Sequence, residues 1–254
     1  MFFSVFHQTH YQFNGPVFLE PHLLRLCPRS DSGQKLLSFQ LKLDPQPAGF
    51  SDITDAEGNI ARWVWFDGTT QHLDIKAEST IQTERLNPYD YILASPAFQT
   101  HPFQYPLELV PALNVFLDPK GSLGGEKVRN LASTLLKGAQ GDLFSFLNSL
   151  TAHLYEHWQV ADREEGDPFP PEQTLQKKEV SCRDLALLFM AVCRAGGIAS
   201  RFVSGYPEGS PDKGNWELHA WAEVYIPGGG WRGYDPTQGL VVADRHIVLA
   251  ASHQ

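Results

Sequence analysis

Cysteine is scarce in this sequence, with three among 254 residues: Cys27, Cys182 and Cys193. A disulfide framework is built from an even and dense set of cysteines, so an odd, small number in a chain this long is not typical of one. The three thiols are therefore expected to be reduced. The default interpretation is a cytoplasmic protein.

Long hydrophobic runs, basic clusters and a calcium-binding loop are also missing. No stretch of about 18 apolar residues could span a membrane, and the start, MFFSVFHQTHYQF, lacks the basic and apolar regions of a secretory signal. The net charge is −9, and clustered lysine and arginine are what nucleic acids and anionic membranes require. Neither partner is expected, and no cofactor or metal is implied.

Short runs with alternating, β-branched or aromatic residues dominate residues 1–85. Four of them predict strands, and turn signals rich in glycine, proline and aspartate separate them: LLRL, KLLSFQLKL, IARWVWF and LDIKAESTI. Their near-regular spacing favours an antiparallel β-sandwich-like domain. Residues 86–124 then hold six prolines and many aromatic residues, which predicts an irregular connector packed across a second domain.

Residues 125–254 turn helical and then return to strands. KVRNLASTLLKG and GDLFSFLNSLTAHLYEHWQV place apolar residues at three- and four-residue steps. A third helix over 183–195 has one apolar stripe, which includes Cys193, and ends at two glycines. Four strands are expected after it: IASRFVSGY, LHAWAEVYI, WRGYDPT and VVADRHIVLA. The predicted fold class is α+β.

Cys182 stands where the third helix begins. Ser181 suits the N-cap position, and Asp184 three residues later suits a variant of the capping box. The free backbone N–H groups and the dipole at a helix N-terminus favour a thiolate, and Arg183 adds positive charge. The alternative is that Cys182 is a small buried hydrophobic residue.

A cysteine nucleophile needs an imidazole partner and a group that orients it. His219 opens a strand of strict period two and points away from its aliphatic face, and Asp235 closes the next strand. Taken alone, His219 also fits a half-buried strand histidine, and Asp235 fits an Asp-Pro turn. The three residues together are harder to explain in that way.

A simple hairpin across Pro227 to Gly230 would pair residue 226 with 231 and set Asp235 opposite Ala222. Asp235 would then lie three residues from His219, about 10 Å along the strand. Asp235 can contact His219 only if this hairpin is irregular. We therefore predict a bulge or a wider loop in it.

Three blocks resemble the signature of the bacterial transglutaminase-like superfamily, which has a papain-like core: SCRDLALLFMAVCRAGGIASRFVSGY, LHAWAEVYIPGGGW and YDPTQG. The N-terminal part is similar to the β-rich region that often precedes this core. The resemblance implies Cys182 as nucleophile, His219 as general base and acid, and Asp235 as its orienting group. Ser181 stands where the family commonly has a glycine before the cysteine, but serine and glycine both suit an N-cap.

The oxyanion hole and the substrate cleft have further candidates. The backbone N–H of Cys182 is a natural first donor. Gln176 lies six residues before Cys182, the spacing of the glutamine in papain-like proteases, but also fits a solvated loop. Trp216 and Trp221 suit the wall of an acyl-substrate channel or ordinary packing.

His153 to His157 reads HLYEH and matches the inverted zinc-peptidase pattern H-x-x-E-H. The two histidines share a helix face, and Glu156 would be the base. A third ligand is required, and a pattern of five residues also arises by chance.

The predicted function is acyl transfer at amide bonds of a peptide or protein through a thioester on Cys182. Water as acceptor gives a peptidase or amidase, and an amine gives a transglutaminase. Hydrolysis is favoured because no acceptor site is identifiable. A non-catalytic binding or scaffold module is the alternative from another class.

Overall fold

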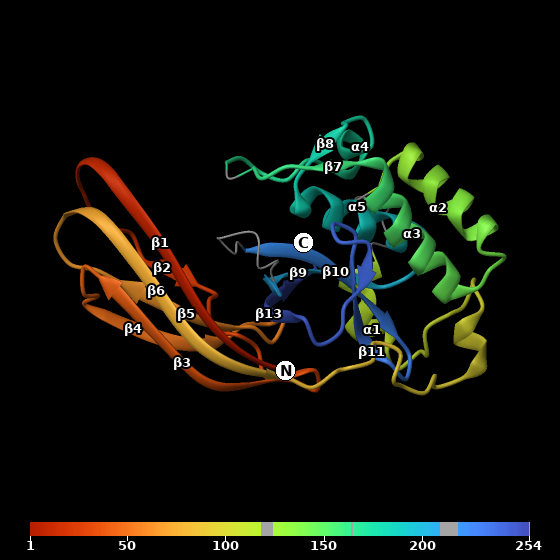
Figure 1. Cartoon of the computed structure of the whole chain (residues 1–254), viewed down its shortest axis with the longest axis horizontal. Helices are drawn as coiled ribbons and strands as arrows, with labels where there is room; N and C mark the ends of the chain where they lie inside the picture. The colour runs from red at the N-terminus through yellow and green to blue at the C-terminus, as the bar shows by residue number, and fades with distance from the viewer. Residues whose placement is uncertain (118–123, 164, 209–217, 254) are drawn as a thin grey trace. The chain divides into compact units, whose positions relative to one another are not determined.

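The structure is a computed structural model that describes residues 1–117, 124–163, 165–208 and 218–253. The chain divides into two compact units (Figure 1). The first comprises Met1–Leu86, Gly205–Trp216 and Asp244–Ala251, and the second comprises Asn87–Ser204, Glu217–Ala243 and Ser252–Gln254. Two segments within the predicted core thus join the first unit, and residues 87–124 belong to the second.

Six strands of the first unit form two antiparallel sheets, with the orders β1-β6-β3 and β2-β5-β4. The strands are β1 (Phe2–Val17), β2 (His22–Leu24), β3 (Gln34–Asp44), β4 (Gly49–Thr54), β5 (Ile60–Trp65) and β6 (Thr70–Thr83). Apolar side chains of both sheets meet in one core, including Val64, Leu73 and Ile75. The predicted antiparallel β architecture is confirmed.

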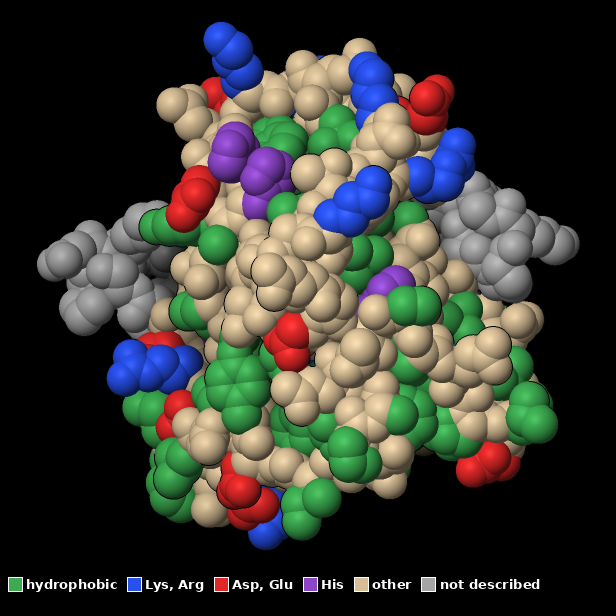
Figure 2. Space-filling view, turned by 90° about the vertical axis from the view of Figure 1, so that its right-hand side faces the viewer, with side chains coloured by type: hydrophobic (Ala, Val, Ile, Leu, Met, Phe, Trp, Pro, Cys, Tyr) green, Lys and Arg blue, Asp and Glu red, His purple; other side chains and the backbone are tan. Residues whose placement is uncertain are grey.

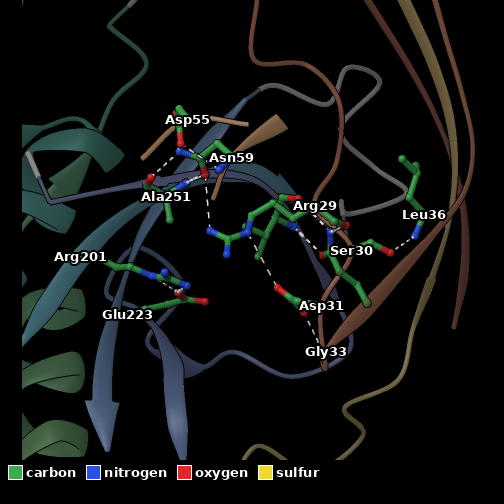
Figure 3. A network of polar contacts seen from close by, with 12 residues as sticks. Arg29, Ser30, Asp31, Gly33, Leu36, Asp55, Asn59, Arg201, Glu223 and Ala251 are labelled. Carbon is green, nitrogen blue, oxygen red and sulfur yellow. Dashed lines mark hydrogen bonds and ion pairs between the residues drawn. The ribbon is translucent and has the colours of Figure 1, made fainter. Parts of the chain in front are cut away.

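Strand β13 (His246–Ser252) lies far along the chain but contributes to the first unit. The side chain of Asn59 donates to the carbonyl of Ala251 and accepts from its N–H, both at 2.8 Å (Figure 3). Asn59 is 1% exposed, so this pair of bonds satisfies a buried amide that would otherwise be costly.

The second unit combines helices with an antiparallel sheet. Its elements are η1 (Pro96–Gln99), α1 (Val110–Leu117), α2 (Glu126–Gly138), α3 (Leu143–His157), β7 (Gln159–Val160), α4 (Pro171–Thr174), β8 (Glu179–Val180), α5 (Cys182–Ala195), β9 (Ser200–Pro207), β10 (His219–Ile226), β11 (Gly230–Asp235) and β12 (Leu240–Val241). The sheet order is β12-β11-β10-β9, with β13 next to β9. No described helix has the length and hydropathy needed to cross a membrane.

Helix α5 is the centre of this unit. Its Leu185, Leu188 and Phe189 are fully buried, and they join one hydrophobic cluster with Val224 of β10 and Leu150 of α3. The apolar stripe predicted for this helix is the stripe that packs on the sheet.

The surface face shown in Figure 2 intersperses charges of both signs with hydrophobic side chains.

The hairpin of β10 and β11 differs from the prediction by one residue. Ile226 pairs with Gly230, not with residue 231, and Ala222 pairs with Tyr234 in a regular ladder. The predicted bulge or wider loop is therefore wrong, because the ladder is regular and the turn is shorter than expected. The turn holds three residues, and the amide of Gly229 donates to the carbonyl of Ile226, which brings Asp235 one residue closer to His219.

Candidate active site

Cys182 is the first residue of α5, and Ser181 caps the helix. The backbone N–H and the hydroxyl of Ser181 both donate to Oδ2 of Asp184, at 2.8 and 2.9 Å. These bonds fix the backbone on both sides of Cys182. The side chain of Cys182 is partly exposed, as a nucleophile must be to meet a substrate.

Asp184 does more than complete the cap. Its carboxylate is fully buried, and its second oxygen, Oδ1, accepts from Nη2 of Arg163 and from the amide of Phe169, both at 2.7 Å. Arg183 makes a further contact with Arg163, because its Nη2 donates to the carbonyl of Arg163 at 2.7 Å. Asp184 therefore ties the loop before α4 to the helix end that carries Cys182.

His219 and Asp235 lie in direct contact. Nε2 of His219 is 2.8 Å from Oδ2 of Asp235, and the side chains are 12% and 0% exposed. Oδ1 of Asp235 accepts from the amides of Thr237 and Gln238 at 2.9 and 3.2 Å. Both carboxylate oxygens are therefore held, which fixes the orientation of the imidazole.

The strand register explains how these two side chains meet. Continued by one pair, the ladder sets Asp235 opposite Trp221, and opposite residues share a sheet face. His219 lies two residues from Trp221 and so occupies the same face as Asp235. A diagonal neighbour of this kind is within reach of a long side chain.

Cys182 lies close enough to His219 to raise its pKa. Since Nε2 faces Asp235, Nδ1 is the ring nitrogen left for the sulfur. Burial lowers the pKa of His219, but the hydrogen bonds and negative charges of Asp235 and Cys182 outweigh it and raise the pKa to about 9. The imidazole is therefore cationic at neutral pH, the state that a neighbouring thiolate requires.

The three residues predicted for the oxyanion hole and the substrate cleft lie in different surroundings. Trp221 is fully buried, and its ring stacks beside His219 with centroids 6.2 Å apart. Gln176 is exposed, and its amide donates to the carbonyl of Glu172 within its own turn. Trp216 lies outside the described residues. The structure thus brings Cys182, His219, Asp235 and Trp221 together.

The other cysteines have different surroundings. Cys193 is fully buried in the core of α5, and burial raises the pKa of its thiol well above the usual value. Burial, with the charge of Asp52, also raises the pKa of Cys27. Both thiols are held in the protonated, unreactive state at neutral pH.

The HLYEH pattern lies on α3, with the rings of His153 and His157 4.1 Å apart. Nδ1 of His157 is hydrogen-bonded to the carbonyl of His153 at 2.9 Å. Within the described ranges, no third histidine, cysteine or carboxylate brings a ligand atom to this pair. A zinc-peptidase site needs that third ligand.

Two family models match this chain. The first, described as the bacterial transglutaminase-like N-terminal region, matches residues 3–82, and the second, the transglutaminase-like superfamily, matches residues 129–236. The second match contains Cys182, His219 and Asp235.

Individual proteins are similar over different spans. An uncharacterized protein of Mycobacterium tuberculosis (strain H37Rv) is 27% identical over 97% of this chain and 82% of its own length. The uncharacterized protein YebA of Bacillus subtilis is 27% identical over 45% of this chain and 18% of its own. A crystal structure from Cytophaga hutchinsonii, described as a "putative cysteine protease", covers all of this chain and 84% of its own with a TM-score of 0.74 at 20% identity. The last comparison shows the fold.

Proposed function

The chain belongs to the transglutaminase-like superfamily, with a bacterial transglutaminase-like N-terminal region, and on that premise we propose that it is a cysteine enzyme of amide-bond acyl transfer. Cys182 is the nucleophile, His219 the general base and acid, and Asp235 the group that orients His219. The observation that carries the proposal is the hydrogen bond between His219 and Asp235, with the thiol of Cys182 near enough at the start of α5 to raise the pKa of His219.

In the first half of the reaction the thiolate of Cys182 attacks the amide carbonyl carbon. The carbonyl oxygen becomes an oxyanion, which the backbone N–H of Cys182 at the start of α5 is suited to bind. The C–N bond then breaks as His219 gives its proton to the leaving amine, and a thioester remains on Cys182.

In the second half an acceptor resolves the thioester. His219, now neutral, takes a proton from water or from an amine as this acceptor attacks the carbonyl carbon. The C–S bond breaks, and the thiolate returns beside the imidazolium. Asp235 stays ionised throughout and stabilises the cationic ring.

We favour hydrolysis, so that the enzyme is a peptidase or amidase of peptide or protein substrates. Water reaches a partly exposed thiol without a binding site, whereas an amine acceptor needs one. The fold likeness to the Cytophaga hutchinsonii protein is in keeping with this choice. The alternative is a transglutaminase. A cytoplasmic location belongs to the same proposal, because it keeps the thiol reduced.

A glutamine-containing peptide library with a fluorescent amine tests both readings. Hydrolysis predicts peptide fragments or ammonia without amine incorporation, and transamidation predicts fluorescent peptide. Cys182→Ala should abolish either product, while Cys193→Ala should retain it. Turnover that survives Cys182→Ala would overturn the proposal. Correct folding with no turnover of any substrate would favour a non-catalytic module.

A further inference from the structure

Four ligand-type side chains meet on one sheet of the first unit, away from the residues of the proposed active site. His10 lies on β1, His72 and Asp74 on β6, and Asp44 at the end of β3. Asp74 is paired with His10 on one side and with Asp44 on the other. These four residues are called the His-Asp cluster below.

The cluster faces away from the hydrophobic core. Leu73 and Ile75, which flank Asp74, are buried in the core of the first unit. Because side chains alternate along a strand, His72 and Asp74 both point to the opposite face. That face is open to solvent at the cluster, where the side chains of Asp44 and His10 are 71% and 52% exposed.

Three of the four groups offer ligand atoms at suitable separations. One ligand atom each from Asp44, His72 and Asp74 lies within 4.8 Å of the other two. Nε2 of His72 is 3.4 Å from Oδ2 of Asp44. Two ligands at about 2.0 Å from a tetrahedral ion are about 3.3 Å apart, so this pair already has the spacing that an ion requires.

His10 completes the arrangement from outside. Its Nδ1 lies 2.7 Å from Oδ1 of Asp74, so Oδ2 of that carboxylate is the oxygen not used by His10. An outer hydrogen bond of this kind orients a carboxylate that binds a metal ion, and it is a common feature of metal sites.

The charges favour a cation at this point. Asp44 and Asp74 are direct neighbours across two strands, and like charges directly opposite each other destabilise a sheet. A divalent ion between the carboxylates would reverse that repulsion.

We propose that Asp44, His72 and Asp74 bind a divalent transition-metal ion, with His10 as the outer partner and water in the remaining positions. One imidazole and two carboxylates suit Zn²⁺, and also Co²⁺ or Mn²⁺, better than the all-oxygen ions Ca²⁺ and Mg²⁺. The ion would join β3 to β6. The site is independent of the proposed catalytic function.

Calorimetric titration with Zn²⁺ tests the site on the full chain at pH 7.5. The parent for this test carries Cys182→Ala and His153→Ala, which remove the thiol of the proposed active site and the HLYEH pair as competing ligands. We expect one Zn²⁺ per chain. Asp44→Asn and His72→Ala should each weaken binding by more than tenfold, and His10→Ala by about tenfold or more.

Co²⁺ absorption and a control variant complete the test. Bound Co²⁺ should give visible bands that Asp44→Asn abolishes, and His22→Ala, on the other sheet of the first unit, should change nothing. Asp44 is exposed, so its asparagine variant should fold, and circular dichroism checks this. Absence of Zn²⁺ binding at 100-fold excess of ion, or equal affinity in the parent and Asp44→Asn, would overturn the proposal.

Discussion

Replacing Asp184 by asparagine tests whether this carboxylate holds the start of α5 in place. Asparagine keeps the shape of the side chain but turns one acceptor oxygen into a donor. The buried amide of Ser181 or the half-buried amide of Phe169 then loses its acceptor, and Arg163 loses its ionic partner.

The expected cost follows from these contacts. A hydrogen bond to a charged group contributes about 1.5–3 kcal/mol, and removing one partner of a buried ion pair costs about 3–5 kcal/mol. Arg163 is 25% exposed, so water compensates part of its loss. We expect Asp184→Asn to lower the free energy of unfolding of the second unit by about 3 kcal/mol.

Trapping of the buried thiol of Cys193 measures this quantity for the second unit alone. In a Cys27→Ser and Cys182→Ser background, alkylation against urea concentration reports when α5 becomes exposed. Asp162→Asn is the matched control, because Asp162 is an exposed carboxylate of the same loop and its loss should change stability by less than about 0.5 kcal/mol. A similarly small change for Asp184→Asn would refute the role assigned to this carboxylate.

Two further predictions concern stability. The pKa of His219 is about 9 in the folded state against 6.5 for the free side chain, so its contribution, at most about 3 kcal/mol, is present below pH 6.5 and lost as the pH rises through 9. Urea titrations should show this loss in the parent and not in His219→Gln. Gly49→Ala should destabilise the first unit by about 1–3 kcal/mol, because the added Cβ would overlap the ring of Trp65; an unchanged melting temperature would contradict it.

Local features of the sequence predicted the start of α5 well. A capping box spans only four consecutive residues, so Ser181 and Asp184 identify the helix start without knowledge of the fold. Arg163 and Phe169, the other partners of Asp184, come from a loop at least 15 residues earlier. Nothing in the spacing of the sequence pairs them with this carboxylate.

Features that depend on strand pairing were harder to predict. Strand β1 (Phe2–Val17) carries many polar residues, so its composition does not predict a strand. Its long pairing with β6 holds it in the sheet. The β10–β11 register depends on a three-residue turn that the sequence PGGG does not distinguish from a four-residue turn. The His-Asp cluster likewise unites β1, β3 and β6 through their registers alone.

The alkylation rate of Cys182 tests the central claim most directly. Peptide mass spectrometry after timed iodoacetamide treatment at pH 6 gives the rate for each cysteine in the parent and in His219→Ala. We predict that Cys182 in the parent reacts at least tenfold faster than Cys193, and that His219→Ala removes most of this difference because the thiolate loses its imidazolium. Equal rates for Cys182 in the parent and in His219→Ala would contradict the account.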